Sequence, residues 1–528
     1  MTEPIQTHSA PPRKRRRLLR GAIVLSVLLL ALFWFTPAII ARTELRNRIV
    51  GSALKDFNGT IRSGGASMGW FSAVEFTDVT MTEPSGRVAI TAPRVTTSKT
   101  LWQLAFQRDD LGTFQIHEPE ILVSVENGTT NVEEWIANYT KDDGTPPKPE
   151  RLAFAIETVH GRATLKGTPD TQLQNVAFLF RSPKSRAEPL TIHLAAEAAD
   201  GGKLDATVLL GTDTGVTLNA AAFPLGTLGP VLPRFSPDTA IDGSLTADAR
   251  GKWNTSADKP MTVEFTGSGN VSDFALRAPW LKGETLSLRT VALLKSEIET
   301  SENGRIDVKS LRLLCDVGDA SVAGQFDRGF DSDQLLRQSG VEVVANVDLA
   351  KLAALLPKLL RIRGDTTIRR GSVGLTLKSE ANSAGTLWVG NVQTRDVEAV
   401  RGQQVLTWKS PLQGSFRGRL RGDGLPEFED LKVLSEFISL AARGQPEAFT
   451  AAARLDLRKL TAQLEQFIDL GAITLAGEGI VRLNTKPVPN ADTTEVRGSI
   501  DLTKLEIRDG TLVLLAEPEL HIALDAVG

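Results

Sequence analysis

The residues that could carry out chemistry are few and widely separated along the 528-residue chain. There is one cysteine, Cys315, and the five histidines are His8, His117, His160, His193 and His521. A lone cysteine allows neither an intrachain disulfide nor a cysteine-based metal cluster, and histidines so far apart give a metal ion no obvious ligand set. The phosphate-binding G-x(4)-G-K-[ST] and zinc-binding H-E-x-x-H motifs do not occur. We therefore expect no catalytic residue, no metal site, no cofactor and no enzymatic activity.

Composition narrows the class of protein further. Hydrophobic residues make up 41% of the chain, charged residues make up 23%, and the formal net charge is −3. This much apolar material is enough for a folded protein, so wholesale disorder is excluded. The charge balance disfavours a broadly basic nucleic-acid-binding protein, and we expect no nucleic-acid partner.

The N-terminus predicts a membrane anchor. Gly21–Ile40 carries no charge, and its apolar residues include Ile23, Leu28, Phe33, Trp34 and Ile40. At 1.5 Å per residue, a helix of this length spans about 30 Å, the hydrocarbon thickness of a bilayer. The cations before it predict a cytoplasmic N-terminus, with the chain beyond residue 41 across the membrane; they are Arg13, Lys14, Arg15, Arg16, Arg17 and Arg20. The alternative is a signal peptide cleaved after Ile39-x-Ala41.

A short helix is expected after the anchor. Pro37 is suited to opening it, and Leu45, Ile49, Ala53 and Phe57 fall on one face at a spacing of four. The helix is expected to end near Asn58-Gly59. Its apolar face either packs against the first strands or lies on the membrane surface as a platform.

Most of the remaining sequence predicts β-strands. Apolar and polar residues alternate in short runs separated by Gly, Asn-Gly and Asp-Gly, which is typical of hairpins in an antiparallel sheet with one apolar face. The apolar lining expected from this alternation comprises Val74, Phe76, Val88, Ile90, Phe114, Ile116, Ile121, Val123, Val125, Val373 and Leu375. A one-residue error in register would reverse the face of a predicted side chain.

The second half contains a repeat. Residues 347–375 align without gaps to 455–483, and both copies contain D-L-x-K-L, beginning at Asp348 and Asp456. A looser copy lies near 223–253, and a bare D-L-x-K-L recurs at 501–505. Each full copy predicts a strand end, an amphipathic helix, a loop and a strand. The helix must bury its apolar stripe against the sheet or over an opening in it; the stripe in the first copy is Leu352, Leu355, Leu356, Leu359 and Leu360.

Two architectures are compatible with such strands. A closed sandwich would make the apolar face an ordinary core, whereas an open, curled sheet would make it the lining of a long hydrophobic groove. A groove of this kind suits acyl chains, because apolar area binds them without precise polar contacts. The alternation of residues does not separate the two architectures.

The N-terminal region, residues 21–136, resembles AsmA-like proteins, relatives of TamB and of the chorein-type bridge-like lipid transfer proteins. Besides the anchor and the short helix, the resemblance is carried by Gly65-Ala66-Ser67-Met68-Gly69-Trp70-Phe71, Val74-x-Phe76-x-Asp78-Val79, Gly86-Arg87-Val88, Ala92-Pro93-x-Val95, Leu101-Trp102-x-Leu104, Ile116-x-Glu118-Pro119-Glu120-Ile121 and Asn127-Gly128-x-x-Asn131. The D-L-x-K-L copies resemble repeats found later in such proteins.

The resemblance implies a single-pass protein of the bacterial inner membrane with its bulk in the periplasm. The implied fold is mostly β: a transmembrane helix, then an elongated, curled, antiparallel, groove-like β-sheet with short amphipathic helices in repeats. The implied role is to hold phospholipids or transfer them towards the outer membrane. The alternative is a scaffold for outer-membrane proteins that binds an outer-membrane or periplasmic partner by strand addition.

The expected organisation has five parts. Residues 1–20 form a cytoplasmic basic tail, 21–40 the anchor, and 41–140 an AsmA- or chorein-like domain. Residues 141–150 (KDDGTPPKPE) are charged, contain three prolines and form the expected linker. Residues 151–528 form the repeated β-rich region.

Overall fold

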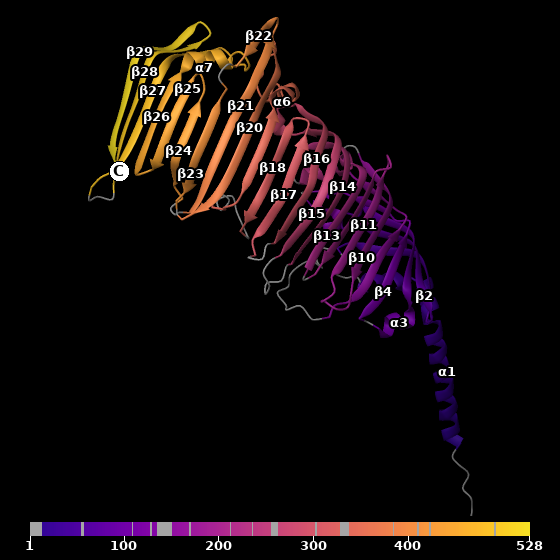
Figure 1. Cartoon of the computed structure of the whole chain (residues 1–528). Coiled ribbons are helices and arrows are strands. Elements are labelled where there is room, and N and C mark those ends of the chain that lie inside the picture. The colour runs from indigo at the N-terminus through magenta and orange to yellow at the C-terminus, as the bar shows by residue number, and fades with distance from the viewer. Residues whose placement is uncertain are drawn as a thin grey trace, which may run out of the picture. The chain divides into compact units, whose positions relative to one another are not determined.

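A computed structural model of the chain is shown in Figure 1. It describes residues 13–53, 58–107, 109–126, 129–134, 150–167, 170–211, 213–234, 236–254, 262–300, 304–327, 337–383, 385–408, 411–421, 424–489 and 493–528. The side chains of residues 13–21, 52, 53, 126 and 233 lie outside this description, as does most of the expected linker. The chain divides into two units, residues 1–196 and 197–528, and each is treated separately below.

The N-terminal unit begins with the apolar helix α1, Arg13–Arg42. Within it, Ala22–Arg42 has a mean hydropathy of 2.6 and is long and apolar enough to cross a membrane. Pro37 lies inside α1, so the expectation that it opens the next helix is wrong. That helix, α2, spans Leu45–Ala53 and begins after a break at Thr43 and Glu44. Residues 54–57, between Ala53 and the expected end of this helix near Asn58, lie outside the described residues.

The sheet of the N-terminal unit follows. Its elements are β1 (Thr60–Gly69), β2 (Ser72–Thr82), β3 (Val88–Thr100), α3 (Leu101–Phe106), β4 (Asp110–His117), β5 (Glu120–Val123), β8 (Ala153–Val159), β9 (Gly161–Leu165) and β10 (Thr171–Ser182), and β11 (Leu190–Ala198) contains the division between the units. β6 (Val125–Glu126) and β7 (Thr129–Thr130) form a separate hairpin.

Pairing in this sheet is mostly antiparallel, with two parallel contacts. β8 pairs in parallel with β4, and β9 pairs in parallel with β5. The strands that follow the expected linker therefore belong to the same sheet as those before it. The two units divide after Ala196, whereas we expected a boundary near residue 150.

The C-terminal unit is a second run of neighbouring antiparallel strands, visible in Figure 1 as successive hairpins of a curled sheet. The strands are β12 (Lys203–Leu210), β13 (Asp213–Pro224), β14 (Ala240–Asn254), β15 (Val263–Arg277), β16 (Thr285–Thr300), β17 (Ile306–Cys315), β18 (Gly318–Phe326), β19 (Glu342–Asp348), β20 (Thr366–Asn382), β21 (Gly385–Arg401), β22 (Gln404–Thr407), β23 (Gln413–Leu420), β24 (Pro426–Leu434), β25 (Ile438–Gln445), β26 (Ala448–Asp456), β27 (Ile473–Pro487), β28 (Thr494–Asp509) and β29 (Leu512–Val527).

The two full repeat copies have the expected structure. Helices α6 (Leu349–Leu355) and α7 (Leu457–Leu464) each follow a strand and precede a long one. The D-L-x-K-L motif is a helix start, because the Asp348 carboxylate accepts from the backbone N–H of Lys351 at 3.1 Å and Asp456 accepts from that of Lys459 at 2.9 Å. α6 ends before Pro357, so it is shorter than its leucine stripe suggests.

The other copies differ. In place of the α-helix, the looser copy contains two 3₁₀ turns, η1 (Leu225–Leu228) and η2 (Leu232–Arg234). The N-cap of η1 is Pro224, which makes no side-chain cap. The motif at 501–505 stays extended inside β28. Asp501 pairs with Ile480 on one neighbouring strand and with His521 on the other, so here the same letters lie within the sheet and do not start a helix.

Short helical segments cover one set of strand ends. A further 3₁₀ turn, η3 (Pro279–Leu281), carries the fully buried Leu281, which packs with Leu356 at the end of α6. The loop after α6 forms an antiparallel bridge between Ile362 and Ile468, which follows α7. The fold class expected from the sequence is thus confirmed: the chain is mostly β, with an N-terminal apolar helix, a curled, mostly antiparallel sheet and short helices in the repeats.

Candidate functional site

The most distinctive feature of the C-terminal unit is a row of apolar residues that runs from strand to strand. Paired residues on neighbouring strands share a face of the sheet. Following the pairing from β12 to β29, with β22 outside it, gives Leu204, Ala220, Ala247, Gly269, Leu293, Leu313, Ala320, Ala345, Leu375, Val392, Gly414, Val433, Leu440, Ala453, Val481, Ile500 and Ile522. No polar side chain interrupts this row.

A second row lies two residues further along each strand and therefore on the same face. From β17 to β29 it comprises Leu311, Val322, Val343, Leu377, Gly390, Phe416, Leu431, Ala442, Ala451, Leu483, Gly498 and Leu524. The Phe416 ring lies over Gly390, where an added Cβ would clash with it. We call the surface formed by the two rows the C-terminal apolar face.

Parts of this face are accessible to solvent, since Leu313, Leu375 and Val392 in the first row are 44%, 39% and 37% exposed. Other parts are covered: Ala220 is buried, and second-row residues such as Leu377 and Phe416 pack against a buried cluster that includes Val341 and Trp388. Each described strand makes its main contacts with its neighbours in the sheet or with a short helix at its end. The described strands of the C-terminal unit all belong to one sheet.

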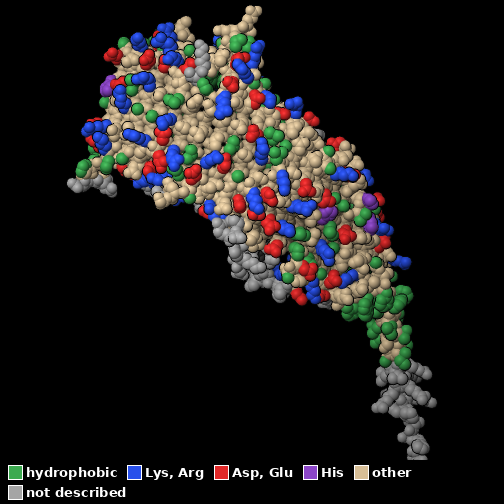
Figure 2. All heavy atoms as spheres, in the orientation of Figure 1, with side chains coloured by type: hydrophobic (Ala, Val, Ile, Leu, Met, Phe, Trp, Pro, Cys, Tyr) green, Lys and Arg blue, Asp and Glu red, His purple; other side chains and the backbone are tan. Residues whose placement is uncertain are grey.

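The opposite face is polar. On each strand, the residue adjacent to the first-row residue belongs to the opposite face. From β19 to β23 these adjacent residues pair with one another, and they are Asn346, Gly374, Gln393 and Gln413. Cross-strand ion pairs lie on the same side, including Lys378 with Glu342 at 2.8 Å and Arg482 with Asp501 at 3.3 Å. Figure 2 shows Lys, Arg, Asp and Glu side chains spread over the side of the molecule that faces the viewer. Water therefore suits one face of this sheet and not the other.

The N-terminal unit has the same two-faced character. Phe76, Val95 and Ile116 pair in one row, and Phe114, Ile156 and Phe180 form the next row of the same face. On the other face, Glu75, Thr96, Gln115 and Glu157 form the intervening row, and Gln115 donates to Glu157 at 3.1 Å. We call the phenylalanine-rich surface the N-terminal apolar face.

A line of kinks crosses this sheet. Asp78, Glu118, His160 and Asn175 all have φ near +50° and occupy corresponding positions on neighbouring strands. A residue in the left-handed conformation adds one residue to a strand, so the side chains that follow it change faces relative to a simple two-residue alternation. Apolar residues spaced three and then two positions apart, such as Phe76, Val79 and Met81, therefore stay on one face. Simple alternation misses this, although the spacing itself is visible in the sequence.

The predicted lining residues fall in several places. Phe76, Phe114 and Ile116 lie on the N-terminal apolar face, and Val373 and Leu375 are on the same face of β20 as the first row. Ile90 pairs with Met81 on one side and with Ile121 on the other, and these three residues form a row on the far side of the kinks from Phe76. Val123 lies two residues after Ile121 in β5. Val74 is only 3% exposed and is a core residue.

Two predicted residues lie elsewhere. A bulge at Ala89 pairs Met81 with Ile90 but Thr82 with Val88, so Val88 and Ile90 face opposite sides. Val125 belongs to the separate β6–β7 hairpin and pairs with Thr130. Whether the remaining residues line a lipid site stays a prediction.

The anchor residues lie on the surface of α1. Ile23, Leu28, Phe33 and Trp34 are 46–63% exposed, and Ile40 is partly buried. Such exposure suits a lipid environment, since in water it would leave a large apolar surface uncovered. The side chains of the six N-terminal cations are outside the described residues.

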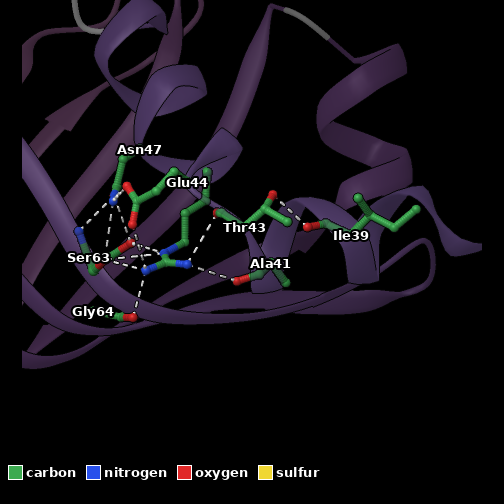
Figure 3. A network of polar contacts seen from close by, with 8 residues as sticks. Ile39, Ala41, Thr43, Glu44, Asn47, Ser63 and Gly64 are labelled. Carbon is green, nitrogen blue, oxygen red and sulfur yellow. Dashed lines mark hydrogen bonds and ion pairs between the residues drawn. The ribbon is translucent and has the colours of Figure 1, made fainter.

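A polar network joins the anchor to the sheet (Figure 3). The Arg46 guanidinium of α2 donates to the backbone carbonyls of Ser63 and Gly64 on β1, at 3.0 and 2.7 Å, and to that of Ala41 at 3.3 Å. The Asn47 side chain accepts from the backbone N–H of Ser63 at 2.9 Å. The face of α2 that meets the sheet is therefore polar, and the apolar Leu45 and Ile49 are exposed.

A second buried network holds the β2–β3 turn. The Glu83 carboxylate accepts from Asn131 at 2.7 Å and from Arg87 at 2.9 Å, and Arg87 also donates to Ser124. Burial would raise the pKa of Glu83, but hydrogen bonds from Asn131, Ser85 and Arg87 outweigh it and hold the pKa below its ordinary value. This network is structural, because every group in it bonds to another member.

Other features carry no chemistry. A cavity of about 540 Å³ between α2 and β1 is lined by polar and charged residues, including Arg48, Arg62 and Glu44, and lies away from both apolar faces. Residues 65–69 match the letters G-x-S-x-G, but Ser67 sits within β1 opposite Glu75, not at the strand-to-helix turn that a nucleophile requires. Among the described residues, no group of three His, Cys, Asp or Glu side chains could hold a metal ion.

Comparison with known proteins gives no match to a protein family, to a curated protein or to a solved structure.

Proposed function

We propose that this chain is an AsmA-like, single-pass protein of the bacterial inner membrane that holds or transfers phospholipids towards the outer membrane. Its N-terminus would be cytoplasmic, and the β units would lie in the periplasm. The observation that carries the proposal is the unbroken first row of the C-terminal apolar face, which is exposed at Leu313, Leu375, Val392 and Ile522. The curled sheet would act as a groove for acyl chains.

The energetics support acyl chains as ligands. Removing one methylene from water contributes about 0.8 kcal/mol, so covering a chain of about 16 carbons contributes on the order of 10 kcal/mol. Neighbouring strands lie about 4.8 Å apart, so the first row extends for roughly 75 Å measured across the strands. That is several times the length of one acyl chain, about half of a 30 Å bilayer core.

The absence of fixed polar groups on this face also suits movement. Binding that depends on apolar area alone has no preferred register along the row. A lipid chain displaced by one strand spacing meets the same kind of surface. The polar opposite face would meanwhile keep the sheet in water.

Photocrosslinking in living cells tests the proposal on the full chain. A benzophenone amino acid in place of Leu375 lies in the first row of the apolar face. The same amino acid in place of Lys378, on the same strand, lies on the polar face. We expect phospholipid adducts, detected by mass spectrometry, at position 375 and not at 378. Equal labelling at both positions, or none at 375, would contradict a lipid-binding face.

A scaffold function is the second candidate, and one observation favours it. β29 pairs with β28 on one side, and no described strand pairs with its other side. Its first residues, Leu512 to Leu515, are 38–62% exposed. Such an edge can accept a partner strand through backbone hydrogen bonds. Protein adducts from a crosslinker at Leu514, without lipid adducts at Leu375, would favour this candidate.

A further inference from the structure

An aromatic cluster lies where the N-terminal sheet meets the anchor helix. It consists of Phe33 from α1, Trp70 and Phe71 from the β1–β2 turn, and Trp102 and Phe106 from α3. Ring centroids are 4.2 Å apart for Phe33 and Trp70, 6.0 Å for Phe71 and Trp102, and 4.3 Å for Trp102 and Phe106. We call Trp70, Phe71, Trp102 and Phe106 the aromatic tip.

A hydrogen bond attaches the tip to the anchor helix, and Pro37 explains why its acceptor is available. The Trp70 indole N–H donates to the backbone carbonyl of Phe33 at 2.9 Å. In an uninterrupted helix that carbonyl would accept from the residue four positions later, which here is Pro37 and has no N–H. Trp70 therefore satisfies a carbonyl that Pro37 leaves without its helical donor. Pro37 itself is buried.

The position of Phe33 along α1 sets the depth of the tip. Phe33 precedes Arg42 by nine residues, which corresponds to about 14 Å at 1.5 Å per residue. With Arg42 at the membrane surface, Phe33 lies near the middle of the apolar span Ala22–Arg42. A side chain bonded to its carbonyl lies at a similar depth, among acyl chains.

The exposed surface of the tip fits that environment. Phe71 and Phe106 are 69% and 67% exposed, and Trp102 is 40% exposed. Figure 2 shows hydrophobic side chains gathered where α1 meets the sheet. Among the described charged residues that follow or precede α3, Lys99 pairs with Asp110 at 2.7 Å and Asp109 pairs with Lys184, which lowers the cost of bringing them near the membrane.

The tip is also held as a unit. The backbone N–H of Trp102 donates to the carbonyl of Trp70 at 3.0 Å, which ties the start of α3 to the β1–β2 turn. Thr100 and Gln103 form a capping box at the start of α3. The aromatic side chains thus project from a preformed structure.

We infer that the aromatic tip is inserted into the membrane leaflet from which the sheet emerges, docked on the anchor through the bond from Trp70 to the Phe33 carbonyl. The ligand of this surface is the acyl-chain layer of the bilayer. The inference rests on the proposed single-pass anchor. It adds that a part of the β unit, and not α1 alone, is immersed in lipid.

Depth-dependent quenching tests the inference with the full-length chain in phosphatidylethanolamine and phosphatidylglycerol vesicles. A Cys315→Ser background receives one cysteine at a time, Phe71→Cys, Leu28→Cys or Pro84→Cys, labelled with an environment-sensitive fluorophore. Phe71 and Pro84 are both exposed, so neither change removes a core side chain. We expect lipid-attached quenchers to reduce the signal at 71 and 28 at least threefold more than at 84, and aqueous iodide to quench mainly 84.

The outcomes separate the two claims. Lipid quenching at 28 with iodide quenching at 71 would overturn the aromatic tip and leave the anchor intact. Iodide quenching at both 28 and 71 would overturn the anchor itself. Trp70→Phe keeps an aromatic ring but removes the donor, and it is expected to lower the lipid quenching at 71 without changing that at 28.

Discussion

The Arg46 guanidinium donates to the backbone carbonyl of Gly64 at 2.7 Å and thereby closes the outer edge of β1 with a side chain from α2. An unpaired strand edge carries free carbonyls, and a buried cation that bonds to several of them fixes the helix on that edge. At α2, the connection between the membrane helix and the sheet is therefore a polar contact.

Arg46→Ala is expected to loosen this connection. The substitution removes several charge-assisted hydrogen bonds and leaves the carbonyls of Ser63 and Gly64 without that donor, at a cost of about 2–4 kcal/mol. Amide hydrogen exchange of the full-length chain in nanodiscs should show faster exchange in α2 and β1. The exposed Arg62 on the same strand is the control, and equal effects of Arg62→Ala would contradict a specific role for Arg46.

The bond from Trp70 to Phe33 predicts coupling between Trp70 and Pro37. Trp70→Phe should destabilise tip docking by about 1–2 kcal/mol, because it leaves a carbonyl unsatisfied in lipid. In a Pro37→Ala background, the backbone of the new alanine supplies the missing N–H to the Phe33 carbonyl, and the same change should cost much less. A double-mutant cycle measured by exchange in the β1–β2 turn checks this. Additive effects would show that the two residues act independently.

Much of this fold follows from the sequence. The uncharged run 21–40, the two-residue alternation and the aligned D-L-x-K-L copies each reflect a local rule: a membrane-length helix, a two-faced strand and an Asp N-cap. These rules need no knowledge of distant contacts. The anchor helix, the β architecture and helices α6 and α7 could therefore be predicted.

The details that failed depend on context. Pro37 looked like a helix start, but the helix continues through it because Trp70 replaces the missing donor from far along the chain. Val88 looked equivalent to Ile90, but one extra residue at Ala89 reverses its face. The unbroken apolar rows emerged only from the pairing of all the strands, since no single strand shows what its partners place beside it.

The Glu83 network predicts an acid-dependent loss of stability in the N-terminal unit. The pKa of Glu83 is lower in the folded state than its ordinary value of 4.5, so the folded chain binds its proton less readily than the unfolded chain. The stabilisation is complete above the ordinary pKa and is lost as the pH falls through the lowered, folded-state pKa. The protection factors of the amides in β2 and β3, taken against the intrinsic exchange rate at each pH, should therefore fall as the pH falls below about 4.5.

Glu83→Gln provides the comparison for this pH effect. The amide keeps an acceptor for Asn131 but cannot titrate, so the variant should be less stable at neutral pH and should lose less stability on acidification. Glu120→Gln, on the exposed side of β5, is the matched control. A wild-type profile as flat as that of Glu83→Gln would show that Glu83 does not contribute to the acid response.

The C-terminal apolar face predicts a face-specific effect of charge on lipid binding. Leu375→Asp places a carboxylate in the first row, where it disfavours an acyl chain, whereas Thr376→Asp places one on the neighbouring polar side. Because Leu375 is 39% exposed, the new carboxylate keeps access to water and the strand should remain folded. Val392 pairs with Leu375, so a benzophenone amino acid at position 392 reports on lipid in this part of the row. Phospholipid crosslinking at position 392 should fall several-fold in Leu375→Asp and stay unchanged in Thr376→Asp. Circular dichroism of both variants reports the fold. Unchanged crosslinking in folded Leu375→Asp would mean that acyl chains do not occupy this row.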